Sequence, residues 1–264
     1  MPGDLEGSPA LTFAPLMDIS GEELPYRSLG REMERRYEAY KNQIVRPFFH
    51  DHFARLDRQI VLVDTLAALN SGPAAVCDLE TALAEVLMAF RTGRGNLLTT
   101  MFRPKIDRIL FAATKADHLH HTSHDRLEAI LRLLTARAIN RAEGVGAEIG
   151  VIALAGVRAT REALVRHDGE QLMAIVGVPM KGEKIGQEAF DGKSEGAIFP
   201  GDLPKDPKEA FEGDALGLED EEAEYRFLKF RPPIAKMGAD QLPLPLPHIR
   251  LDRAIEFLIG DRLK

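Results

Sequence analysis

The sequence predicts an α/β fold in which helices flank a parallel sheet. Three apolar runs carry this prediction, at residues 60–63, 108–113 and 149–155. None of them alternates between apolar and polar residues, and this indicates strands that are covered on both faces. Segments with helical periodicity separate the runs, and strand–helix–strand connections of this kind make consecutive strands parallel.

The first fifty residues read as an N-terminal loop and a helical segment. Residues 1–27 contain four prolines and three glycines and show no sustained period, as expected of an extended loop. From Ser28, apolar residues recur at helical spacing as far as Ile44. Pro47 is expected to end or kink this helix, because proline has no N–H to donate within it.

Helices are predicted after the first and the second strand. The first has an apolar stripe over residues 79–90 and stops at Gly93 and Gly95. The second is expected to open at Thr122, with Asp125 three residues later completing a capping box. Its buried face is expected to consist of Leu127, Ile130, Leu131, Leu134 and Ala138.

Residues 178–264 have a different character. Nine of the sixteen prolines lie in residues 178–247, which predicts a Pro/Gly-rich, irregular β region. Residues 242–247 alternate leucine and proline and predict an extended polyproline-like segment, here called the strap. The strap could bind a partner domain or lie along the protein's own surface. The last helix, with Leu251, Ala254, Ile255 and Leu258 on one face, is expected to close over the sheet.

The sequence motif Thr114-Lys115-Ala116-Asp117 follows the second apolar run directly. A Thr/Asn-Lys-x-Asp tetrad after a buried strand is typical of guanine recognition. An ionised carboxylate such as that of Asp117 can accept from both the N1–H and the N2 amino group of guanine, whereas adenine presents an acceptor at N1. Lys115 would lie across the base, and Thr114 would tie the loop to its neighbours. The alternative is an ordinary surface turn after a core strand.

Two other strand ends are expected at the same edge, since ligands bind beyond the carboxyl ends of parallel strands. After the third run, Gly156 and Val157 form a small turn whose N–H groups could approach the guanine O6, although Gly156 could equally be an ordinary strand-end glycine. Asp64 follows the first run. It is expected to cap a helix or anchor a loop rather than to hold Mg²⁺.

Histidines crowd the loop after the tetrad, at His118, His120, His121 and His124. They lack the helical spacing and the nearby thiolate of common zinc sites, so no metal site is predicted there or at the second cluster, His50-Asp51-His52. His118, next to Asp117, could instead cover the base. Catalytic residues cannot be assigned from the sequence.

Composition limits the remaining possibilities. The net charge is −7 and the basic residues are spread along the chain, which argues against a nucleic-acid partner. Cys77 is the only cysteine, and no apolar run reaches the roughly 18 residues that span a bilayer. These features predict a cytoplasmic protein. The phosphate-binding pattern GxxxxGK[ST] does not occur in the sequence, so only the guanine-recognising half of a nucleotide site is expected here.

Several long segments resemble the YcjX-like family of bacterial GTP-binding P-loop proteins. They are residues 2–15, 53–64, 106–118, 156–162, 199–204 and 246–254, and the resemblance covers nearly the whole chain. Members of that family carry a P-loop and a D-x-P-G motif N-terminal to the segment that this chain resembles. The resemblance therefore implies that the chain lacks an N-terminal portion.

The resemblance also implies a fold and a function. It implies a partial P-loop NTPase (GTPase-like) sheet, with residues 51–177 as the second half of the nucleotide-binding domain. Lys115, Asp117 and His118 would contact the guanine of GTP or GDP, and Gly156 and Val157 would line its far edge. Mg²⁺ would bind only with the missing half, and the complete protein would be a stress-associated GTPase.

A partner protein, located at the inner membrane, is a further expectation. Two alternatives stay open: a non-enzymatic interaction module, and an ATP-using P-loop relative.

Overall fold

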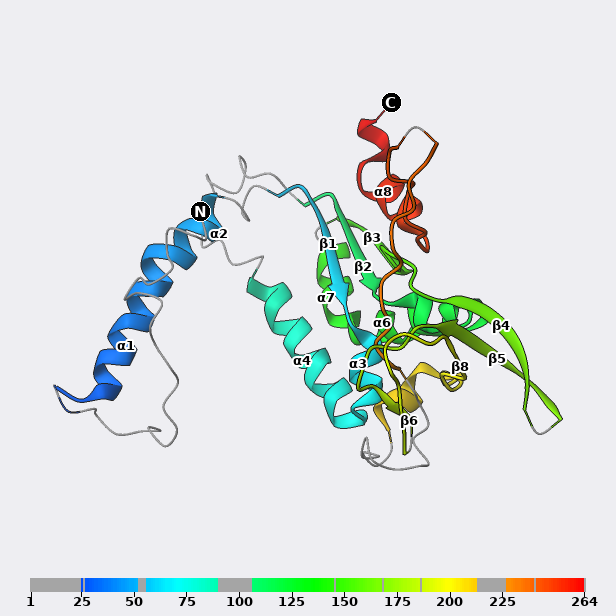
Figure 1. Cartoon of the computed structure of the whole chain (residues 1–264). Coiled ribbons are helices and arrows are strands. Elements are labelled where there is room, and N and C mark those ends of the chain that lie inside the picture. Colours follow the sequence, from blue (N-terminus) through cyan, green and yellow to red (C-terminus); the bar gives the residue numbers. More distant parts are fainter. Residues whose placement is uncertain are drawn as a thin grey trace. The chain divides into compact units, whose positions relative to one another are not determined.

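The computed structural model describes residues 25, 27–51, 56–89, 106–144, 146–167, 169–185, 187–212, 227–239 and 241–263 (Figure 1). The chain divides into two compact units. One consists of Met1–Leu56 with Gly93–Pro104, and the other of Asp57–Thr92 with Lys105–Lys264. No helix in these described ranges is both long and apolar enough to cross a membrane.

In the first unit, a helical segment runs beyond the proline that was expected to interrupt it. Helix α1 (Leu29–Tyr40) begins after Ser28, whose hydroxyl accepts from the Arg31 N–H. A π-helical turn, η3 (Lys41–Val45), leads into α2 (Arg46–Asp51). Of the two expected effects of Pro47, an end of the helix is therefore not found, because α2 continues through the proline. The irregular turn lies just before the proline, where the Arg46 N–H donates to the Lys41 carbonyl.

The second unit is built on the predicted parallel sheet. Strands β1 (Arg58–Val63), β2 (Arg108–Ala113) and β3 (Glu148–Ala153) pair in that order, and both pairings are parallel. The register sets Ala113 beside Val63 on one side and Ala153 on the other. All three strands therefore end at the same level, as the sequence predicted.

Helices pack on both faces of this sheet (Figure 1). Those on the first face share one core with Phe111 and Ala113: α3 (Thr65–Asn70), α4 (Pro73–Ala89), α6 (His124–Leu134) and α7 (Ala136–Glu143). The short 3₁₀ helix η7 (Pro207–Phe211) joins the same core through Ala210. Helix α8 (Leu251–Ile259) packs on the second face, where Ala254 contacts the cluster of Leu110 and Ile152.

Two details differ from the sequence-based expectations. Strand β1 is not covered on both faces, because the side chains of Ile60 and Leu62 are 38% and 61% exposed. The second predicted helix does not open with a capping box at Thr122. A 3₁₀ turn, η6 (His121–Ser123), comes first, and the Thr122 N–H donates instead to the His120 ring. The predicted buried face of that helix is confirmed, although a break at Thr135 divides it.

A second, antiparallel sheet follows β3. It contains β4 (Arg161–His167), β5 (Glu170–Gly177) and β8 (Gly196–Ile198), and β6 (Lys184–Ile185) pairs separately with β7 (Glu188–Ala189). Ile175 and Ile198 pack with Leu228 and Phe230 in a small core of their own. Residue 177 is the expected end of the nucleotide-binding half. Because β8 pairs with β5, the antiparallel sheet contains residues from both sides of that position.

The strap lies along the protein's own surface, one of the two predicted alternatives. The Leu244 N–H donates to the Lys236 carbonyl at 2.8 Å, and the Arg158 N–H donates to the Pro247 carbonyl at 2.6 Å. Beyond the strap, α8 closes over the sheet as predicted, but Phe257 rather than Ile255 packs inward. Gly150 makes room for that ring, since an added Cβ would lie 3.2 Å from it.

The C-terminal end of the chain is joined to the start of β1. The Arg58 guanidinium binds both carboxylate oxygens of Asp261, in the 3₁₀ helix η8 (Gly260–Arg262), and donates to the Leu258 carbonyl at 2.5 Å. This hydrogen-bonded guanidinium lowers the pKa of Asp261 to about 2, from an ordinary value of 3.8.

We expect Asp261→Asn to lower the unfolding midpoint near neutral pH, because it removes the charge that Arg58 binds. A carboxylate whose pKa is lowered in the folded state stabilises that state at pH values above its unfolded pKa. This contribution is lost as the pH falls from about 4 towards 2. The difference in midpoint between wild type and variant should therefore shrink on acidification, measured by circular dichroism. The exposed Asp202→Asn serves as control, and a pH-independent difference for Asp261→Asn would contradict the assignment.

Candidate functional site

The tetrad loop is held between the ends of β1 and β3. The Thr114 N–H and hydroxyl both point to the Val63 carbonyl, at 2.9 and 3.3 Å. Two residues later, the Ala116 N–H donates to the Leu154 carbonyl at 3.1 Å. The backbone of the tetrad thus continues the pairing of the sheet on both sides, and Thr114 ties the loop to its neighbour as predicted.

Lys115 has a left-handed backbone, with φ 62° and ψ 33°. Such a conformation costs a non-glycine residue about 1 kcal/mol or more, so the surrounding contacts must impose it. The Lys115 ammonium lies 2.5 Å from one carboxylate oxygen of Asp64. The other oxygen accepts from the Ala67 N–H in the first turn of α3. The predicted capping role of Asp64 is confirmed, and its contact with Lys115 is an addition that the sequence did not suggest.

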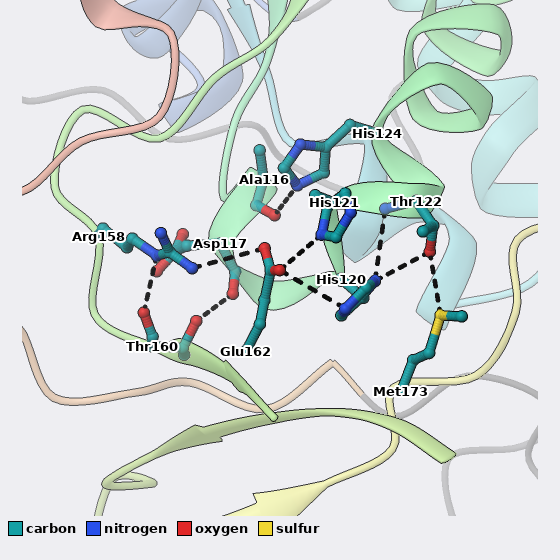
Figure 2. Close-up of polar contacts among 10 residues, drawn as sticks. All are labelled: Ala116, Asp117, His120, His121, Thr122, His124, Arg158, Thr160, Glu162 and Met173. Atoms are coloured by element: carbon teal, nitrogen blue, oxygen red, sulfur yellow. Dashed lines mark hydrogen bonds and ion pairs between the residues drawn. The ribbon is translucent and has the colours of Figure 1, made fainter. Parts of the chain in front are cut away.

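Asp117 is held by the segment that follows β3. Its carboxylate oxygen Oδ2 accepts from the Ala159 N–H at 2.7 Å. Its carbonyl accepts from the Thr160 hydroxyl (Figure 2). The residue is only 4% exposed. A carboxylate offers about four acceptor positions. The Ala159 N–H uses one of them, so the group retains capacity for further donors.

His124 supports the same loop from the start of α6. Its ring nitrogen Nε2 donates to the Ala116 carbonyl at 2.8 Å, and the side chain is buried at the start of α6 (Figure 2). Burial lowers the pKa of His124, although the hydrogen bond to Ala116 opposes this shift. The ring is therefore neutral at pH 7 and carries its proton on Nε2.

His118 packs against the segment around Phe230. Its ring is buried and meets the edge of Phe230, with the ring centres 5.1 Å apart. Burial lowers the pKa of His118, while the charge of Asp117 acts in the opposite direction. In this structure His118 belongs to the packing between the loop and the segment around Phe230.

The Gly156–Val157 turn is exposed at the carboxyl end of β3. An added Cβ at Gly156 would meet nothing within 4 Å, so the space in front of this backbone is open. The turn is anchored at its base by the antiparallel bridge between Ala155 and Ile249. The structure therefore brings Thr114, Lys115 and Asp117 to the same edge as this turn.

A further polar group gathers beside the tetrad loop. Glu162, near the start of β4, lies 2.6 Å from the His121 ring nitrogen and 3.5 Å from both His120 and Arg158. Burial alone would raise the pKa of Glu162, but the hydrogen bond with His121 and the neighbouring positive charges lower it overall. His118 and His124 have other partners, so the loop's histidines do not form one ligand set. The side chains of the His50–His52 cluster lie outside the described residues.

Sequence reasoning missed Ala159, Thr160 and Glu162. Each meets a residue of the tetrad loop from more than 40 positions away. No spacing rule signals such a contact, because it depends on how the segment after β3 returns beside the loop.

Comparison with known proteins agrees with the resemblance. The model of the YcjX-like family, DUF463, matches residues 1–263. Two curated relatives are each named Ras-like GTPase YcjX, and both alignments cover 100% of this chain. The protein from Escherichia coli (strain K12) is 37% identical over 274 residues, and that from Shewanella oneidensis (strain MR-1) is 29% identical over 271 residues.

The alignments cover 53% and 52% of those two proteins, so the chain spans about half the length of the curated relatives it matches. The family match, by contrast, extends over almost every residue of this chain. The chain therefore belongs to the YcjX-like family.

Proposed function

We propose that this chain supplies the guanine-recognising part of a GTP- and GDP-binding protein with a P-loop NTPase, GTPase-like fold. The observation that supports this most directly is the position of the tetrad. It follows the central strand of a parallel sheet, and the Asp117 carboxylate is fixed by the Ala159 N–H. Parallel α/β sheets bind their ligands at this edge.

Each residue has a defined part in this proposal. The free acceptor positions of Asp117 receive the N1–H and N2 amino group of guanine. The methylene stem of Lys115 lies across the base, and N–H groups of the Gly156–Val157 turn donate to O6. Thr114 holds the loop. His118 contacts the base only after its ring leaves Phe230.

The complete protein is proposed to hydrolyse GTP. Phosphoryl transfer depends on a phosphate-binding loop, its lysine and Mg²⁺. We assign these groups to the part of the relatives that this chain does not match. A stress-associated role, a cytoplasmic location and a partner protein at the inner membrane belong to the same proposal.

A second candidate function is an interaction platform without nucleotide chemistry. The observation in its favour is the strap, on which Leu242, Leu244 and Leu246 are all exposed. Nucleotide selectivity separates the two candidates, because an interaction platform has no reason to distinguish GDP from ADP.

In the full-length protein, we expect GDP to bind more tightly than ADP, and Asp117→Asn to weaken GDP binding. Removing one partner of a charge-assisted pair typically costs a tenfold or larger factor in affinity, about 1.5–3 kcal/mol. The variant should gain affinity for XDP, since xanthine has an acceptor where guanine has an amino group. Isothermal titration calorimetry measures all three. Asp125→Asn, whose side chain is 90% exposed, is the matched control. Equal affinities of wild type for GDP and ADP would rule the proposal out.

The 264-residue chain alone is expected to have little or no GTPase activity, because its sequence contains no GxxxxGK[ST] motif. Phosphate release from GTP with Mg²⁺ present is the measurement. Adding the part of the relatives that this chain does not match should produce turnover that the chain alone lacks. Rapid, magnesium-dependent hydrolysis by the purified chain would show that the active site lies elsewhere.

A further inference from the structure

We propose that His120, His121 and Glu162 bind a divalent transition-metal ion, with zinc as the best match. Their ligand atoms all lie within 4.8 Å of one another. The two histidines follow the tetrad loop, and Glu162 comes from β4 (Figure 2). This inference stands apart from guanine recognition, because none of the three residues is assigned to the nucleotide.

The separations suit a single ion. The Glu162 oxygen Oε2 lies 2.6 Å from Nδ1 of His121 and 3.5 Å from Nε2 of His120. Zinc binds nitrogen and oxygen at about 2.0–2.2 Å in tetrahedral geometry, which sets the ligand atoms about 3.3 Å apart. The two separations from Glu162 lie on either side of this value, and the ligand atoms of all three residues lie within 4.8 Å of one another.

A second layer of contacts orients the His120 ring. Its Nδ1 lies 3.0 Å from the Thr122 hydroxyl, which in turn donates to the sulfur of Met173 at 3.3 Å (Figure 2). Because the Thr122 hydroxyl donates its hydrogen bond to Met173, its oxygen can accept a hydrogen bond from the Nδ1–H of His120. That arrangement leaves a lone pair on Nε2, facing Glu162. Metal-binding histidines usually donate their other ring N–H in this way.

The Thr122 N–H also lies 3.5 Å from Nδ1 of His120. This contact suits the opposite tautomer, in which Nδ1 accepts and Nε2 carries the proton. That contact is long, and a metal ion at Nε2 would favour the tautomer in which Nδ1 donates to the hydroxyl.

The donor set and its surroundings select the class of metal. Two imidazoles and one carboxylate suit zinc and other late transition metals, whereas Mg²⁺ and Ca²⁺ prefer oxygen ligands. The Arg158 guanidinium approaches Oε1 of Glu162 and leaves Oε2 for the metal. The side chains of His120 and Glu162 are 12% and 25% exposed, but that of His121 is 64% exposed. The ion would therefore keep access to solvent and to a fourth, water ligand.

The location gives the site a structural consequence. His120 is three residues after Asp117, and Glu162 is two residues after Thr160, which already donates to Asp117. A bound ion would add a second link between the tetrad loop and β4, next to the existing hydrogen bond. Ions that bind the folded state alone raise its stability in proportion to the logarithm of their concentration.

The test is titration of zinc chloride into the chelator-treated chain, followed by calorimetry and by thermal unfolding. We expect saturable binding of a single ion by this site and a higher unfolding midpoint. Glu162→Gln and His121→Gln should each weaken binding by roughly 100-fold, and Thr122→Val by roughly tenfold through the loss of orientation. The exposed His248→Gln should bind zinc as wild type does.

Zinc should also shift the imidazole NMR signals of His120 and His121 while leaving that of His124 unchanged. Circular dichroism checks that each variant is folded. If His121→Gln does not fold, the isosteric Glu162→Gln variant still provides the test. Absence of zinc binding by wild type would overturn the proposal, as would a Glu162→Gln variant that binds zinc with wild-type affinity. Neither outcome bears on GDP selectivity.

Discussion

The candidate site depends on the pairing of β2 with β1 on one side and β3 on the other. The register ends all three strands at one level, and the tetrad backbone extends both pairings by one more hydrogen bond each. Within β2, Phe111, Ala112 and Ala113 are completely buried. The loop that carries the proposed guanine contacts thus continues the best-buried strand of the sheet. The core and these hydrogen bonds hold the loop in place.

Hydrogen bonds and an ion pair within the chain hold the site in place. The carboxylate of Asp117 is oriented by a backbone N–H, and the Ala116 carbonyl in the same loop accepts from the Nε2–H of a neutral histidine, His124. Lys115 is held in a left-handed conformation with its ammonium on Asp64. Groups that are already positioned before binding lose less conformational entropy when the ligand arrives, and this favours affinity. The arrangement suits a site that distinguishes bases by the direction of its acceptors.

The central sheet and the position of the tetrad could be predicted from the sequence because their signals are local. Unbroken apolar runs identify buried strands, and the run at 108–113 behaves accordingly, whereas the run at 149–155 is fully buried only from Ile152 onwards. The run at 60–63 misled, since an edge strand can be as apolar as a central one while one face stays exposed. The capping box at Thr122 was wrong because a local alternative exists: His120 caps a 3₁₀ turn, and its ring accepts from the Thr122 N–H. Glu162 and Thr160 could not be found at all, because their partners lie more than 40 residues away.

The strap has a mechanical consequence. The Arg158 N–H donates to the Pro247 carbonyl, and Ala155 exchanges two backbone hydrogen bonds with Ile249. Arg250, directly after this bridge, binds Glu128, and Glu128 accepts from the Ala153 N–H. These hydrogen bonds and the ion pair therefore link the turn after β3 to the start of α8. A displacement of the turn that keeps these bonds intact must carry Pro247, the last residue of the strap, with it.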